Sequence, residues 1–183
     1  NDNEIGDEGA KALASTLPSL VRLELLSLRC NCVRDAGAEA LGKAVPDAKA
    51  LHTFFIQGNQ LTSDGVVCIC AAVPKCKTLV ELRLGGINMG QAGAEAIAEM
   101  LPMARALQVL GLSYADIGKK GAAVIVSAVR HAPALIQLDG LELNQHLKEL
   151  GLPHTHHLSS NTAIFQAIRQ AKTFYKSPPG TPT

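Results

Sequence analysis

Hydrophobic positions change their spacing halfway through each 28-residue segment of this chain. Between Leu23 and Leu28 the apolar side chains follow an L-x-x-L-x-L order, which directs them to one side of a short strand. Leu41 and Val45 come after the turn, four residues apart, which is the spacing of one helix face. The pattern therefore predicts a unit made of a strand, a turn and a helix.

The same unit recurs with no insertion, since a shift of 28 residues brings its apolar positions into register. The inward strand and helix positions of the later units are Leu51, Phe54, Ile56, Ile69 and Val73; Leu79, Leu82, Leu84, Ile97 and Leu101; Leu107, Leu110, Leu112, Ile125 and Val129; and Leu135. Residues 1–17 form the second half of an earlier unit. One such unit cannot bury its apolar face alone, so the units are expected to stack into a solenoid.

Glycine and proline also recur in single columns of the repeat. The glycines stand where each helix begins, at Gly9, Gly37, Gly65, Gly93 and Gly121. Because small residues follow them, they let each helix approach its neighbour closely. The prolines stand after the helices, at Pro18, Pro46, Pro74 and Pro102. Proline in that place stops helical growth and turns the chain back.

Asparagine occupies the turn between strand and helix in the first three units, at Asn3, Asn31 and Asn59. Its side chain hydrogen-bonds to backbone groups of the turn, and stacked units would align these amides into a ladder. The next two equivalent positions are Ile87 and Ala115, whose side chains cannot make these bonds. Altered turns are therefore predicted around residues 85–90 and 113–118.

Residues 23–41 read LELLSLRCNCVRDAGAEAL. This segment resembles the leucine-rich repeat L-x-x-L-x-L-x-x-N-x-L followed by a G-A-x-A-L helix, the pattern of the ribonuclease-inhibitor-like class. RanGAP and the repeat domains of NOD-like receptors are similar as well. The resemblance implies an α/β leucine-rich repeat solenoid, a right-handed arc with a parallel sheet on its concave face and helices on its convex face. Strands about 4.8 Å apart and helices about 10 Å thick give the same curvature when the units stack.

Three parts are expected along the chain. Residues 1–143 form the repeat array, about five copies with a partial first one, and residues 135–143 are its degenerate last strand. Residues 144–172 form a C-terminal capping segment with a helix over about 161–172. Residues 173–183 form a disordered tail. The chain begins with asparagine inside a repeat whose strand is missing, so a fragment of a longer protein is expected.

Composition narrows the classes of partner and compartment. The 17 Lys and Arg against 16 Asp and Glu leave a net charge of +1, spread along the chain, so neither nucleic acid nor a membrane is an expected partner. No apolar run reaches the roughly 18 residues of a membrane span. The 5 cysteines, odd in number and uneven in spacing, favour reduced thiols in a cytoplasmic protein.

Outward strand positions, between the buried leucines, define the candidate surface for binding a protein partner. They are Leu25, Ser27 and Arg29; Thr53, Phe55 and Gln57; Glu81, Arg83 and Gly85; Val109, Gly111 and Ser113; and Gln137 and Asp139. Phe55 is an exposed aromatic between Leu25 and Arg83, and aromatic and arginine side chains are enriched in binding hot spots. The alternatives are a solvated face without a partner, or a Phe55 that only packs on Leu25.

Motifs for metal binding or catalysis have little support in the sequence. The pairs Cys30-x-Cys32 and Cys68-x-Cys70 lack the C-x-x-C spacing typical of zinc sites, which favours buried or turn thiols. A histidine cluster consists of His146, His154, His156 and His157. It falls in a connecting segment without a spaced cysteine partner, which favours a solvated loop over a metal site. Residues 117–121 contain glycine and lysine without the spacing of a P-loop.

These patterns favour a non-enzymatic scaffold that binds a protein through the concave face, with no cofactor and no catalytic residue. One alternative, which the resemblance implies, is a GTPase-activating protein like RanGAP. That family presents an arginine from turns at the edge of the arc, a place that Arg29 or Arg34 would occupy here, although neither matches a family motif. A second alternative is the ligand-sensing repeat portion of a larger signalling or immune receptor.

Overall fold

The computed structural model describes residues 2–140, which alternate between helices and short strands. The helices and strands are α1 (Asp7–Thr16), β1 (Leu25–Ser27), α2 (Asp35–Ala44), β2 (Thr53–Phe55), α3 (Ser63–Ala72), β3 (Glu81–Arg83), α4 (Gly90–Met100), β4 (Val109–Gly111), α5 (Gly118–Val129) and β5 (Gln137–Asp139). The predicted strand, turn and helix unit is confirmed. The expected end of the array at residue 143, the capping segment 144–172 and the tail 173–183 lie outside the described residues.

The prolines after the first three helices lie in short 3-10 turns. These turns are η1 (Leu17–Ser19), η2 (Val45–Asp47) and η3 (Val73–Lys75). The fixed φ of proline suits the first positions of such a turn, and the ring blocks continuation of the α-helix. The expectation that this column ends the helices is therefore confirmed for these repeats.

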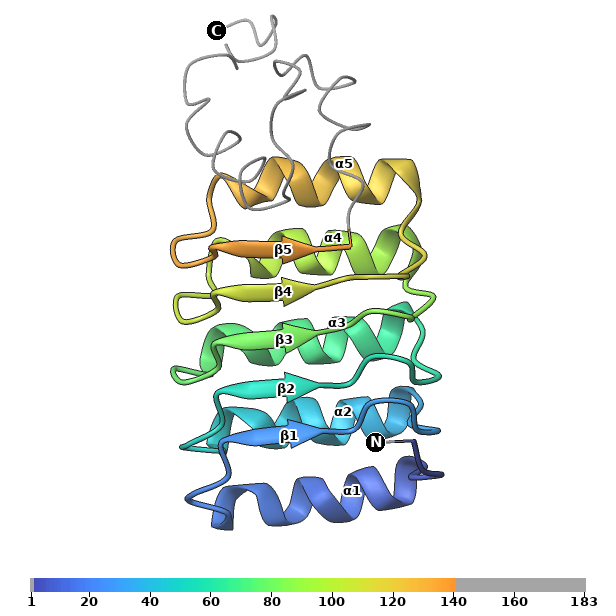
Figure 1. The fold of residues 1–183 in the computed structure, drawn as a ribbon, viewed down its shortest axis with the longest axis vertical. Coiled ribbons are helices and arrows are strands. Elements are labelled where there is room, and N and C mark those ends of the chain that lie inside the picture. The colour runs from blue at the N-terminus through green and yellow to red at the C-terminus, as the bar shows by residue number, and fades with distance from the viewer. Residues whose placement is uncertain (1, 141–183) are drawn as a thin grey trace, which may run out of the picture.

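The strands form a single parallel sheet in the order β1-β2-β3-β4-β5, and the described helices lie on one side of it (Figure 1). Leu25 pairs with Thr53, which pairs with Glu81, so the register follows the 28-residue period. The sheet is open: β2, β3 and β4 each lie between their sequence neighbours, and β1 and β5 are the outermost described strands. The predicted α/β solenoid is confirmed.

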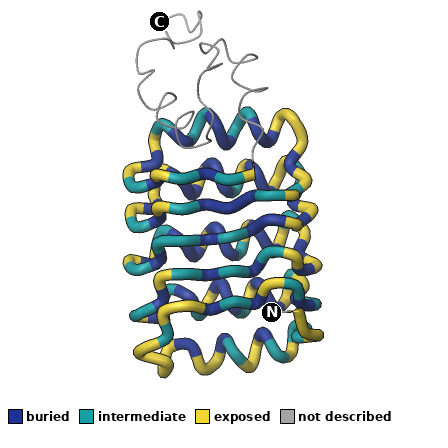
Figure 2. The backbone as a smooth tube through the Cα atoms, in the orientation of Figure 1, coloured by how far each residue is buried: buried dark blue, intermediate teal, exposed yellow. Residues whose placement is uncertain are grey.

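The core runs between the sheet and the helices as continuous rows of aliphatic side chains. The central strand row is Leu26, Phe54, Leu82, Leu110 and Leu138, each at most 9% exposed. Figure 2 shows the same dark band of buried residues passing through the sheet. The predicted inward residues are buried in the later repeats, whereas Leu23 in the first row is only partly covered.

The glycine column lies in the first turn of each helix and, from α2 onward, at the contact with the preceding helix. A Cβ built on Gly37 would come within 2.9 Å of the Ala10 Cβ and 2.7 Å of the Asp7 Oδ1. A Cβ on Gly121 would come within 2.7 Å of the Ala94 Cβ. These distances are too short for any side chain, so glycine permits the close helix packing that the sequence predicts.

Aspartate at the start of one helix caps the start of the next. The Asp7 Oδ1 accepts backbone hydrogen bonds from Arg34 at 2.8 Å and Gly37 at 3.0 Å. Asp35, 28 residues further on, makes the same two bonds to the start of α3 at 2.8 and 3.0 Å. The caps satisfy helix N–H groups that lack an intrahelical partner, and they join adjacent repeats.

The predicted asparagine ladder is present in the first repeats. The buried Asn31 Oδ1 accepts a hydrogen bond from the Ile5 N–H at 3.1 Å, and its Nδ2 donates to the Leu28 oxygen at 3.0 Å. The Asn59 Oδ1 accepts from the Val33 N–H at 3.1 Å, and its Nδ2 also donates to the Leu28 oxygen, at 2.8 Å. Each amide therefore joins its own turn to the preceding one.

The turns change in the last two described repeats, as the loss of asparagine predicts. Gly90 and Gly118 adopt left-handed φ values of +55° and +67°, where the equivalent Thr62 is extended with a φ of −103°. The Gly90 N–H donates to the Asp116 oxygen at 2.8 Å, and the Asp116 N–H donates to the Ile87 oxygen at 3.1 Å. Backbone groups thus replace the missing amides in joining these repeats.

Candidate functional site

The side of the sheet away from the helices, called here the open sheet face, carries the outward strand positions. The parallel register aligns them in two rows, Leu25, Thr53, Glu81, Val109 and Gln137, and Ser27, Phe55, Arg83, Gly111 and Asp139. Inward neighbours in each strand are buried, whereas these positions are mostly half-buried or exposed. The open sheet face is the surface that the sequence predicts as the concave face.

Arg83 lies at the centre of a side-chain cluster on this face. Its Nε donates to the Glu81 Oε1 at 2.6 Å, and its Nη1 donates to the Asp139 Oδ2 at 3.2 Å. The guanidinium carbon lies 5.8 Å from the centroid of the Phe55 ring, within the range of a cation–π interaction. We call Phe55, Glu81, Arg83 and Asp139 the arginine cluster.

Gly111 makes this arrangement sterically feasible. It stands on β4, between Arg83 on β3 and Asp139 on β5, and a Cβ there would lie 3.1 Å from the Arg83 Cγ. Without a side chain at this position, the arginine extends across β4 to the carboxylate two strands away. The Gln137 amide holds the same carboxylate through a 2.9 Å hydrogen bond.

The ion pairs of the cluster position its side chains more than they stabilise the fold. The side chains of Arg83, Glu81 and Asp139 are 32%, 24% and 26% exposed, so water screens the charges in part. Partly exposed pairs of this kind contribute about 0–1 kcal/mol. Their consequence is a pre-oriented guanidinium beside an aromatic ring.

A pocket of about 300 Å³ lies at the edge of the sheet where the strands end; we call it the edge pocket. It is lined by Arg29, Cys30, Gln57, Gly58, Arg83, Gly85, Gly86, Gly111, Ser113 and Tyr114. The predicted surface residues therefore divide between two places. Arg29, Gln57 and Ser113 line the edge pocket with Arg83, whereas Leu25, Ser27, Thr53 and Val109 lie elsewhere on the sheet.

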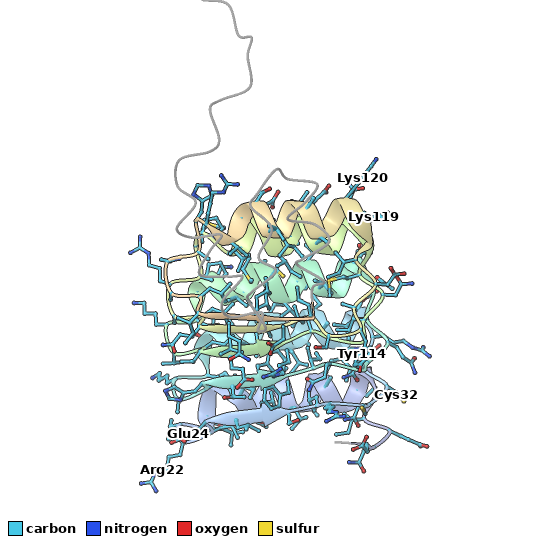
Figure 3. All side chains as sticks on the ribbon, turned by 45° about the horizontal axis from the view of Figure 1, so that its top comes forward. Arg22, Glu24, Cys32, Tyr114, Lys119 and Lys120 are labelled. Carbon is cyan, nitrogen blue, oxygen red and sulfur yellow. The ribbon has the colours of Figure 1, made fainter. Side chains whose placement is uncertain are left out.

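Sequence reasoning missed four residues of this pocket, namely Cys30, Gly58, Gly86 and Tyr114, and Tyr114 carries the largest side chain among them. Its side chain is 94% exposed, and Figure 3 shows it at the edge of the array that also carries Cys32. Its φ is +61°, and the equivalent Cys30, Gly58 and Gly86 are left-handed too, with φ of +50°, +68° and +62°. Asp2, with a φ of +51°, belongs to the same column, and the 28-residue spacing of these five positions was a signal for the shared conformation.

The two arginines considered for GTPase activation lie in different settings. Arg29 is exposed and lines the edge pocket. Arg34 precedes α2, where its Nε donates to the Gln60 Oε1 of the next repeat at 3.0 Å. The structure thus brings Arg29, and not Arg34, to the edge pocket.

The thiols are free and differ in burial. Burial raises the pKa of Cys70 to about 12 and that of Cys76 to about 11. Burial is also the main cause of the raised pKa of Cys68, with smaller contributions from nearby carboxylates, whereas Cys30 and Cys32 are half-exposed. Within residues 2–140 no group of three His, Cys, Asp or Glu is placed to hold a metal ion. The histidine cluster predicted from the sequence lies outside the described residues.

Cations gather at the edge of the array opposite the edge pocket, in the connections from helix to strand. They are Arg22, Lys49, Lys75, Lys77, Arg105 and Arg130, against the acidic Glu24 and Asp47. Positive charge, which is evenly distributed along the sequence, is therefore in excess at this edge of the folded array. No helix among the described residues is long and apolar enough to cross a membrane.

A family model and the leiomodin-1 structure agree with this architecture. Residues 1–14 and 23–42 match a family model described as Leucine Rich repeat. Actin-binding site 2 of leiomodin-1 is similar in structure, with a TM-score of 0.68 and 13% sequence identity, over 86% of this chain and 87% of that one. An internalin from Listeria monocytogenes aligns with a TM-score of 0.34 and 18% identity, over 67% of this chain and 44% of that one.

No curated protein matches the sequence. The fold is an open α/β solenoid, and two of its segments match the leucine-rich repeat family. The ribonuclease-inhibitor-like subclass stays a prediction.

Proposed function

We propose that this chain is a non-enzymatic scaffold that binds a protein partner through its open sheet face. The observation that carries the proposal is the arginine cluster. Aromatic and arginine side chains dominate the energy of many protein interfaces, and here Phe55 and Arg83 lie together. Because Glu81 and Asp139 already hold the guanidinium, little side-chain entropy would be lost when a partner binds.

The variation between repeats supports the same function. Inward positions keep aliphatic or aromatic residues because the core requires them, whereas the outward row of Ser27, Phe55, Arg83 and Asp139 changes chemistry at every strand. Five strands about 4.8 Å apart span roughly 19 Å, which accommodates a partner helix about 10–12 Å in diameter. The open sheet face therefore offers a surface of sufficient width and distinct chemistry.

The proposal is tested by immobilising the chain and capturing its binding partner from an extract of the source cells. The amount captured is compared between the unmodified chain and two single variants. Phe55→Ala and Arg83→Ala should each weaken the principal partner about 30-fold or more, the loss typical of a hot-spot residue. Val67→Ala is the matched control, because Val67 is 43% exposed on α3, on the helical side of the array. Equal capture by all three variants would show that the open sheet face is not the interface.

Three further assays address the other candidate functions. Actin belongs among the test partners, because the similar leiomodin-1 structure is named for an actin-binding site. GTP hydrolysis by candidate small GTPases tests the RanGAP-like alternative, for which Arg29→Ala and Arg34→Ala are the informative variants. A signalling module on the same polypeptide as the repeats would support the receptor alternative.

A further inference from the structure

We infer that the edge pocket binds a carboxylate of the protein partner, with Arg29 as its ion-pairing group and Tyr114 as a contact at the rim. This inference rests on the proposed function and names the chemistry that the partner presents. The outward strand pattern includes Arg29, Gln57 and Ser113 but assigns no ligand chemistry to them, and Tyr114 lies beyond the strand and outside the predicted surface.

The charges lining the edge pocket favour an anion. Arg29 and Arg83 are the charged side chains of the lining, which contains no aspartate or glutamate. Arg83 already has two carboxylate partners, Glu81 and Asp139. Arg29 is exposed and makes no ion pair with any residue in the described range 2–140. One guanidinium, with its planar pair of donors, thus remains for an incoming group.

The backbone of the pocket favours a carboxylate over a phosphate. Phosphate sites commonly use several free backbone N–H groups. Here the Cys30, Gly58 and Gly86 N–H groups donate to the Gln57, Gly85 and Ser113 oxygens, at 3.0, 2.9 and 2.8 Å. With these donors occupied, a single arginine matches the single charge and planar shape of a carboxylate.

Gln57 provides a second point of recognition. Its Oε1 is buried and accepts no hydrogen bond from any described residue, which is costly for a buried carbonyl. Rotation of the side-chain amide toward the pocket would let this oxygen accept an N–H from the main chain of a bound peptide. Gly58 and Gly86 lack side chains, so a peptide main chain can approach this part of the lining closely.

Tyr114 adds evidence for a bound partner because the fold does not need it. A left-handed φ is unfavourable for tyrosine; the repeat imposes it at this position, where the other described repeats have Asp2, Cys30, Gly58 and Gly86. Tyr114 is 94% exposed, so packing against residues 2–140 does not compensate for that conformation. The turn therefore accounts for the conformation, and what it leaves unexplained is a large exposed aromatic side chain at a position that favours glycine. An exposed ring at the rim suits stacking on a peptide.

Titration of short blocked peptides into the isotope-labelled full chain, followed by NMR, tests the inference. The probes are acetyl-Gly-Glu-Gly amide, acetyl-Gly-Gln-Gly amide, acetyl-Gly-Gly-Gly with a free carboxylate, and inorganic phosphate. The Arg29 and Tyr114 side-chain signals should shift with a carboxylate-bearing peptide and at least about 10-fold more weakly with the glutamine peptide. The first and third probes distinguish an acidic side chain from a chain terminus as the source of the carboxylate.

Two variants complete the test. Arg29→Gln should abolish the carboxylate-dependent shifts, and Tyr114→Gly should weaken binding about 5-fold without loss of thermal stability. Equal binding of the glutamine peptide, tighter binding of phosphate, or no carboxylate-dependent shift at all would each overturn the inference.

Failure of the inference is distinguishable from failure of the proposed function. If Phe55→Ala weakens capture of the protein partner but Arg29→Gln does not, the scaffold function stands and the carboxylate inference fails. If neither variant changes capture of the partner, the open sheet face itself is wrong as the interface.

Discussion

Replacing Tyr114 by glycine should stabilise this protein, although it removes an entire aromatic side chain. Tyr114 has a φ of +61°, and its ring is 94% exposed. A left-handed conformation costs an L-residue about 1–2 kcal/mol, and glycine avoids this cost. Glycine also raises the entropy of the unfolded chain, which costs about 0.4–1 kcal/mol. Because an exposed ring contributes almost no packing, the expected net gain is about 0.5–1 kcal/mol.

Thermal and urea unfolding followed by circular dichroism measure this gain. For a chain of this size the expected rise in Tm is about 2–3 °C. Gly86→Ala is the reciprocal control, because Gly86 occupies the same repeat position with a φ of +62°. A Cβ there would meet its nearest atoms at an ordinary 3.4 Å, so only the backbone conformation is tested. That variant should lose about 0.5–1.5 kcal/mol.

A Tyr114→Gly variant that is destabilised by more than about 0.5 kcal/mol would refute the reasoning. Such a result would mean that the ring stabilises the fold through contacts. Tyr114 would then have a structural role, and its exposure would no longer point to a partner.

Three further predictions concern the repeat joints, the thiols and the arginine cluster. Asp35→Ala should lower the free energy of unfolding in urea by about 1–2 kcal/mol and speed amide exchange at the start of α3, because it removes two hydrogen bonds to backbone N–H groups. The control is Ser63→Ala, at the equivalent position of the next repeat, which should lose less than half as much. The free energy of unfolding should fall as pH rises from about 9 toward 12, because the unfolded Cys70 thiol ionises above its ordinary pKa of 9.0, whereas burial raises the pKa of the folded thiol to about 12. The slope, up to about 1.4 kcal/mol per pH unit, should diminish in Cys70→Ala. An unchanged slope would contradict the assignment to Cys70. Asp139→Asn should change the free energy of unfolding by less than about 1 kcal/mol, because its ion pair with Arg83 is partly exposed. The same variant should weaken partner binding in the capture assay. A larger loss of stability would show that the ion pair stabilises the fold.

Local pattern was sufficient to predict the architecture. The spacing of Leu26, Leu28 and Leu41 predicts which faces are buried, because a strand and a helix direct side chains with fixed periods. The asparagine column predicts the altered turns at Ile87 and Ala115, since an apolar side chain cannot replace the amide bonds. Each of these inferences depends only on residues within one repeat or at a constant offset of 28.

The candidate site was predictable only in part. The alternation along each strand places Phe55 and Arg83 on the same face, and the period places them on adjacent strands. The bond from Arg83 to Asp139 was not predictable, because it joins residues 56 apart across a strand and requires the missing side chain of Gly111. Tyr114 was missed because its position lies in a turn, where the hydrophobic pattern carries no information.

The sequence by itself determined the repeat, its inward rows and the stacking of its units, because a constant period forces equivalent residues into alignment in a parallel sheet. Only the tertiary structure decided which side chains of different repeats meet. The arginine cluster, the edge pocket and the cations at the opposite edge each combine residues from several repeats of the solenoid. Their geometry depends on side-chain length and on empty positions such as Gly111, which a one-dimensional pattern of polar and apolar residues does not record.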